Sequence, residues 1–90
     1  QKELLKNLDG WIIDNSDTSK LTKEFKLNNY EKSIAFTNLI ADLAESQNHH
    51  PKITLEWGSV SLEWWSHKIK GLHMNDFICA AKSDQIFDAF

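Results

Sequence analysis

Five polar residues have types and spacing that could carry out acid–base chemistry. They lie in the second half of the chain and are Glu45, His49, His50, His67 and Asp76. Imidazole has an unperturbed pKa of about 6.5, so a histidine can both give and take a proton at neutral pH. A positioned group of this kind typically accelerates a reaction about 10²–10⁴-fold. We therefore take these five residues as a candidate acid–base site.

The adjacency of His49 and His50 decides whether both rings can serve one site. Neighbours on a strand point to opposite faces, and neighbours on a helix lie about 100° apart. Only an irregular junction lets both rings reach one pocket easily. Without further context, such a pair most often belongs to a solvated loop. Three histidines and an aspartate could instead bind zinc or iron, although no His-x3-His pair on one helix face supports that interpretation.

Composition narrows the range of functions. The 90 residues suffice for one small domain, 1–90, with a net charge of −3. The chain has no arginine and no basic patch, which argues against direct nucleic-acid binding. A single cysteine, Cys79, excludes a disulfide within the chain and is interpreted as a buried apolar residue. No apolar run approaches the ~20 residues of a membrane span and no signal peptide is visible, so we expect a cytoplasmic protein without membrane contact.

The first third of the chain predicts a short helix and two strands. Residues 1–9 have leucines at helical spacing, and Trp11–Asp14 reads as a short strand. Residues 21–27 alternate between apolar and polar side chains, as a half-exposed strand does, with Lys23 as the one exception.

The clearest helix spans residues 28–48. Asn28 and Glu31 resemble a capping box at its start, and Asn48 is a plausible C-terminal stop before Pro51. This places the two adjacent histidines just past a helix end, at the irregular junction that a shared site requires.

Residues 52–67 predict a hairpin with Gly58 and Ser59 as its two-residue turn. Trp57 and Trp64 share the apolar parity and are expected in the core. Trp65 has the opposite parity and is expected to line a pocket or an interface, whereas Trp11 could belong to either core or pocket.

Residues 76–90 predict a final helix, with Asp76 in the first turn, where the helix dipole favours a carboxylate. The order of elements predicts an α+β domain. We expect a four-stranded, mainly antiparallel sheet with about three helices packed on one face.

The spacing Glu-x3-His-His-Pro-x5-Trp-x9-His-x8-Asp resembles the signature of the pterin-4a-carbinolamine dehydratases, and the similarity covers essentially the whole chain. Two positions depart from the family pattern. Ser66 stands where threonine is common, so the hydroxyl is kept. His73 stands where serine or threonine caps the last helix, which puts that cap in doubt and leaves Asn75 as a substitute.

The resemblance implies dehydration of 4a-hydroxytetrahydropterin to quinonoid dihydropterin and water, without a metal or an organic cofactor. It implies that His49 and His67 form the acid–base pair, and that Asp76 orients an imidazole or stabilises its charged form. His50 would belong to the catalytic residues but act mainly by binding the substrate. Glu45 would form a hydrogen bond with the pterin or with a histidine. Trp65 and Trp11 are candidates for the wall against the flat substrate.

Other functions remain open under the same resemblance. Family members also act as dimerisation partners of a transcription factor, a role that would use helix and strand-edge surfaces instead of the histidines. A related pterin pathway, such as molybdopterin metabolism, would use the same site. The resemblance further implies a homodimer or homotetramer and a functional link to an aromatic amino-acid hydroxylase.

Overall fold

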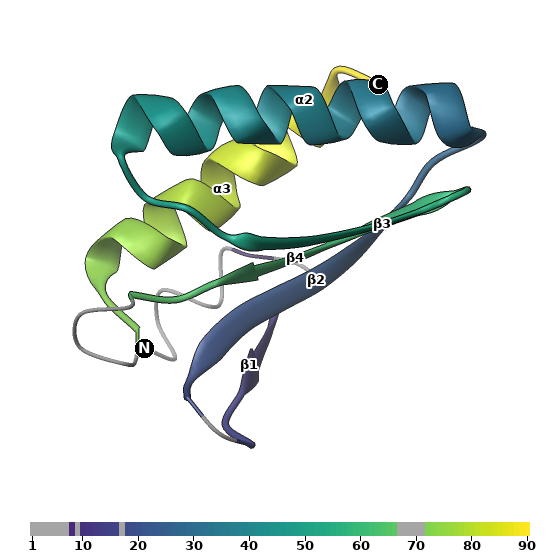
Figure 1. The fold of residues 1–90 in the computed structure, drawn as a ribbon. Helices are drawn as coiled ribbons and strands as arrows, with labels where there is room; N and C mark the ends of the chain where they lie inside the picture. The colour runs from purple at the N-terminus through teal and green to yellow at the C-terminus, as the bar shows by residue number, and fades with distance from the viewer. Residues whose placement is uncertain (1–7, 9, 17, 67–71) are drawn as a thin grey trace.

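Four antiparallel strands form one sheet in the computed structural model, which describes residues 8, 10–16, 18–66 and 72–90 (Figure 1). The sheet order is β1-β2-β4-β3, and the strands are β1 Ile12–Asp14, β2 Lys20–Lys26, β3 Lys52–Glu56 and β4 Ser59–Trp64. Helices α2, Tyr30–Gln47, and α3, Met74–Asp88, lie on one face of this sheet (Figure 1). The α+β class and the four-stranded antiparallel sheet are therefore confirmed.

The number of helices differs from the prediction. The described part of the chain contains two helices instead of about three. The short helix expected over residues 1–9 lies outside the described residues, apart from Leu8, which is buried in the core. Neither α2 nor α3, the helices of the described ranges, has the apolar length that crossing a membrane needs.

The core lies between the sheet and the two helices. β2 and β4 pair so that Leu21 is opposite Trp64 and Phe25 is opposite Val60, all on the helix-covered face. Phe36 of α2 completes an aromatic cluster, with its ring centroid 4.9 Å from that of Phe25. Because side chains alternate between the two faces along each strand, the apolar side chains of β2 and β4 lie together in the core.

Lys23, the exception in the alternation of β2, lies on this inner face opposite Leu62. Its ammonium group is 2.9 Å from a carboxylate oxygen of Asp84 on α3 and 4.8 Å from the ring centroid of Phe25. The indole N–H of Trp11 donates to the same carboxylate, at 3.0 Å. The lysine is accommodated because it has a partner on the covering helix.

The β3–β4 turn is shifted by one residue from the prediction. Glu56 pairs with Ser59, so the turn consists of Trp57 and Gly58. Gly58 allows a close approach to the end of β2, because a Cβ there would lie 3.3 Å from the carbonyl oxygen of Leu27, a tight contact. Trp57 is consequently 68% exposed, and its predicted place in the core was wrong.

The helix starts also differ in detail from the prediction. Asn29, not Asn28, caps α2 and accepts a hydrogen bond from the backbone N–H of Lys32 at 2.8 Å. α3 begins at Met74, two residues before the predicted start, with His73 as its N-cap in place of Asn75. For α2 the two adjacent asparagines have the same capping ability, so local sequence does not choose between them. For α3 the Asp76 side chain accepts from the backbone N–H of His73 at 2.8 Å and so favours the earlier start.

Candidate active site

The end of α2 turns His49 inward. Asn48 adopts the left-handed conformation, with φ 49°, as its predicted role as helix stop requires. The backbone N–H groups of Asn48 and His49 donate to the carbonyls of Glu45 and Ala44, at 3.2 and 3.0 Å. These bonds satisfy the last carbonyls of the helix and reverse the chain. The His49 side chain is 13% exposed and that of His50 is 56% exposed, so the two rings diverge.

His49 is held against residues from two other elements. Its Nε2 lies 2.5 Å from Oδ1 of Asp76, at the start of α3. Its ring stacks on the indole of Trp64, the last residue of β4, with centroids 5.6 Å apart and planes inclined by 20°. The C-terminal end of α2 and the N-terminal end of α3 lie at the same end of the helical layer (Figure 1). The fold therefore joins residues that are 27 positions apart in the sequence.

Asp76 is completely buried and makes hydrogen bonds with three groups. Besides the contact with His49, its Oδ2 accepts from the hydroxyl of Ser66 at 3.0 Å and from the backbone N–H of His73 at 2.8 Å. The last bond belongs to the capping of α3, whose first turn also favours a negative charge. An ionised carboxylate only accepts hydrogen bonds, so three donors suit it.

His50 and Glu45 form a second, exposed pair. His50 Nε2 lies 3.4 Å from Oε2 of Glu45, a long contact between two side chains that are more than half exposed. The structure thus divides the predicted set into a buried His49–Asp76 pair and a surface His50–Glu45 pair.

The remaining predicted residues have different outcomes. His67 lies outside the described residues, so its role stays a prediction. Trp65 is half-buried, with the ammonium of Lys20 4.6 Å from the centroid of its ring. Trp11 lies in the core, which is one of the two positions that the sequence left open. Its indole N–H donates to Asp84, which is eight residues after Asp76 on α3.

Three contributors were not among the predicted site residues. Ser66 supplies a hydroxyl to Asp76, which its match to the family's threonine position could have signalled. His73 caps α3 through a weak 3.5 Å contact of its Nδ1 with the Asn75 N–H, and its backbone binds Asp76. Trp64 was assigned to the core alone, and its stacking on His49 depends on tertiary structure that no local pattern reports.

Within the described ranges, no three His, Cys, Asp or Glu side chains are close enough to hold a metal ion. His67 belongs to the proposed metal set and lies outside those ranges, so this alternative stays untested.

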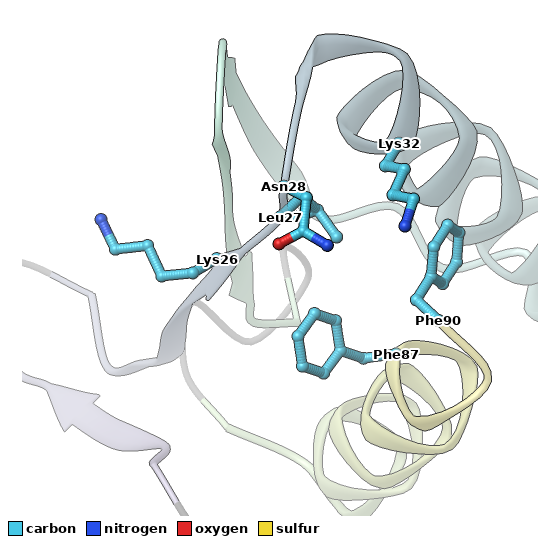
Figure 2. Close-up of a pocket in the computed structure, with 6 residues that line it drawn as sticks. All are labelled: Lys26, Leu27, Asn28, Lys32, Phe87 and Phe90. Atoms are coloured by element: carbon cyan, nitrogen blue, oxygen red, sulfur yellow. The ribbon is translucent and has the colours of Figure 1, made fainter.

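A separate cavity of about 200 Å³ lies between the first turn of α2 and the last turn of α3 (Figure 2). It is lined by Lys26, Leu27, Asn28, Lys32, Phe87 and Phe90. These include none of the predicted site residues, and the Lys26 side chain extends away from the two phenylalanine rings (Figure 2). The cavity is at the opposite ends of α2 and α3 from the His49–Asp76 contact.

Comparison with known proteins agrees with the signature. Residues 1–86 match the family described as Pterin 4 alpha carbinolamine dehydratase. The chain belongs to this family. A protein of Vibrio cholerae, provisionally named a pterin-4-alpha-carbinolamine dehydratase, is 53% identical over 87 residues, covering 96% of this chain and 80% of the relative. A protein of Chlorobium luteolum with the same provisional name is 46% identical, covering 96% of this chain and 76% of the relative.

Two solved structures resemble the pterin-4a-carbinolamine dehydratase fold seen here. A transcriptional coactivator/pterin dehydratase from Brucella melitensis has a TM-score of 0.88 at 27% identity, covering 94% of this chain and 89% of that one. A pterin dehydratase-like protein, identified as a RuBisCO assembly factor of the alpha-carboxysome, has a TM-score of 0.74 at 22% identity, covering 87% and 89%. The second likeness shows the fold alone, and both show that this fold carries more than one described role.

Proposed function

We propose that the protein dehydrates 4a-hydroxytetrahydropterin, the 4a-carbinolamine, to quinonoid dihydropterin and water during tetrahydropterin recycling. Family membership supports the substrate class. The observation that carries the proposal is the buried contact between His49 and Asp76, at 2.5 Å, beside a stacked tryptophan. A histidine whose second ring nitrogen is held by a carboxylate is a common arrangement for proton transfer.

The reaction requires two proton movements and no change in oxidation state. The C4a–O bond breaks, and the departing hydroxyl takes a proton and leaves as water. N5 loses its proton, and the electron pair of that N–H bond forms the C4a=N5 double bond. His49 and His67 are the proposed acid–base pair, one giving and one receiving a proton, so the enzyme returns to its starting state after a proton exchange with solvent.

The exposed His50–Glu45 pair suits substrate binding. The pterin ring is flat and has many hydrogen-bond donors and acceptors. An imidazole and a carboxylate at the rim can meet these groups, and the half-buried face of Trp65 offers apolar area against the ring. Asp76 is proposed to orient His49 from its buried position.

The experiment is dehydration of freshly generated carbinolamine followed by ultraviolet absorbance, with protein treated with a chelator. His49→Ala should slow turnover more than about tenfold, because it removes one positioned proton-transfer group. His50→Ala should mainly raise KM, since its ring lies on the surface. Turnover that survives both His49→Ala and His67→Ala would contradict the assignment. Loss of activity on chelation alone would favour the metal site.

A second candidate function is a binding module of the coactivator type, as the description of the Brucella melitensis protein suggests. It is favoured by exposed apolar side chains on α2, namely Tyr30, Ile34 and Leu39. A substrate from a related pathway, such as a molybdopterin precursor, is the further alternative at the histidine site, and competition between the two pterins in the same assay separates them.

We propose that Leu39, an exposed apolar side chain of α2, buries surface in a homodimer or homotetramer. Light scattering coupled to size exclusion should give a mass of two or four chains, and Leu39→Glu should lower it, since a buried charge opposes association. A wild-type monomer at high micromolar concentration would contradict the proposal. Retained dehydration in a monomeric Leu39→Glu variant would separate assembly from catalysis.

A further inference from the structure

The imidazole of His49 is restrained in two directions that are nearly at right angles. Asp76 holds the ring within its plane, through the 2.5 Å contact at Nε2. Trp64 covers one face of the ring, with the two planes inclined by only 20°. Because Trp64 and Asp76 are both fully buried, neither can move without disturbing the core. The ring therefore cannot tilt or flip freely about its side-chain bonds.

The hydrogen bonds around an ionised Asp76 determine which nitrogen of His49 carries hydrogen. Oδ2 of Asp76 already accepts from the backbone N–H of His73 and from the hydroxyl of Ser66. Oδ1 is left for His49, and a carboxylate that only accepts requires a donor at Nε2. A neutral imidazole has a single N–H, so its Nδ1 then carries a lone pair.

Hydrogen bonding within the described residues does not explain a tryptophan at position 64. The indole nitrogen is buried and has no hydrogen-bond partner among them, which is an unfavourable arrangement for a polar atom. The flat contact with His49 does make use of the large ring. Stacked aromatic rings gain interaction energy beyond the area they bury.

We infer that Trp64 is a positioning residue for His49, and that Nδ1 of His49 is the nitrogen that exchanges a proton with the substrate. The inference rests on the proposed dehydration. One proton passes between Nδ1 and the pterin, while the N–H at Nε2 stays bonded to Asp76. Trp64 keeps the Nδ1 lone pair in one direction, so the proton moves along one fixed line.

Nitrogen NMR tests the positioning without any turnover. Long-range ¹H–¹⁵N correlation, recorded well above the ordinary pH range of imidazole titration, should show His49 of the wild type as the Nε2–H tautomer. Trp64→Phe keeps an aromatic face and should preserve this tautomer. Trp64→Leu removes the face, so the ring of His49 can rotate away from Asp76 and a mixture of tautomers is expected. Phe36→Leu, a matched substitution elsewhere in the core, should leave the His49 signals unchanged.

Kinetics then tests the consequence for the reaction. Trp64→Leu should lower kcat more than about tenfold with KM within about threefold of wild type, since only the alignment of the proton transfer is lost. Trp64→Phe and Phe36→Leu should keep at least about a third of kcat. If Trp64→Leu fails to fold, loss of the Nε2–H tautomer in Trp64→Phe, which keeps an aromatic face, would still contradict the inference.

The outcomes separate this inference from the proposed function. An Nδ1–H tautomer in the wild type would overturn the inference whatever the turnover. A wild-type kcat in a folded Trp64→Leu variant with mixed tautomers would also overturn it. A wild type with the Nε2–H tautomer but no dehydration would overturn the proposed function and leave only the positioning of His49 supported.

Discussion

Asp76 combines two duties in a single side chain. It accepts the backbone N–H of His73 at the start of α3, and it holds the ring of His49. Both duties depend on an acceptor with no hydrogen of its own. A neutral amide at the same position would have to point two N–H groups at donors. Stability and catalysis are therefore expected to fall together when this residue is changed.

Asp76→Asn should lower the free energy of unfolding by about 1–3 kcal/mol, through a weakened cap and an unsatisfied buried group. It should also slow turnover more than about tenfold, because His49 loses its acceptor. Urea unfolding and the dehydration assay measure the two effects. Asp88→Asn, an exposed carboxylate on the same helix, is the matched control and should change stability by less than about 0.5 kcal/mol. Wild-type stability in Asp76→Asn would contradict the double role.

At this scale the sequence predicted that His49 and Asp76 belong to one site, but not that the two form a buried pair. The spacing of His49 and Asp76 indicated a shared site, and the structure brings them into contact. That His49 turns inward and His50 outward depends on the left-handed conformation of Asn48 and on what packs beyond it. The family resemblance gave the two adjacent histidines different roles, but the residues alone did not reveal that their surroundings differ.

Among the elements, α3 is tied to β2 by a polar contact inside an apolar layer. Lys23 bonds Asp84 at 2.9 Å, and both side chains are about a fifth to a quarter exposed. Partial exposure weakens such a pair through solvent screening, although the ring faces beside Lys23 reduce access to water. The contact helps to set the position of α3 along the sheet, and so the position of its first turn.

A double-mutant cycle with Lys23→Met and Asp84→Asn should give a coupling energy of about 0.5–2 kcal/mol in urea unfolding. The exposed pair Lys26 and Glu24 is the matched control on the same strand. Its cycle should give less than about 0.5 kcal/mol, because exposed pairs contribute little. Additive effects at Lys23 and Asp84 would show that the contact does not stabilise the packing of α3.

The spacing of apolar residues predicted most of the helices and strands, but not the residues at which they begin and end. The strand alternation and the long helix α2 were strong patterns, so their existence was predictable. The hairpin turn begins one residue earlier than predicted. Gly58 is its second residue and not its first, and at that position it lies close to the carbonyl oxygen of Leu27. Lys23 interrupts the apolar alternation of β2, and it is tolerated because its ammonium group bonds Asp84. This partner is 61 residues away in the sequence. Local patterns contain no information on such distant partners.

The fold as a whole buries Cys79, the single cysteine of the chain. Cys79 is fully buried in α3, and burial, followed by the nearby charge of Asp76, raises its pKa to about 11 from an ordinary value of about 9, opposed by Lys82. Below pH 9 the thiol is protonated in both states. Between about pH 9 and pH 11 the unfolded chain loses this proton and the native chain keeps it, so the unfolded state gains stability.

The free energy of unfolding should therefore fall as the pH rises from about 9 to about 11, with Cys79 contributing up to about 2–3 kcal/mol of the fall. Cys79→Ala should remove that contribution, so its curve should be flatter than that of the wild type. Urea unfolding at several pH values measures both slopes. Parallel curves would show that the thiol does not titrate differently in the two states.

The placement of the site carboxylate in a helix cap has a consequence for evolution. Selection that acts only on expression and folding would retain Asp76, because the start of α3 depends on it. A descendant without dehydratase activity that kept only the fold could still carry this aspartate. The side chain of His49, at the irregular end of α2, has no comparable duty in the helix ends described, where only its backbone N–H takes part. In a comparison of relatives, the histidine is thus the better marker of retained chemistry, and the aspartate reports mainly that the fold has been inherited.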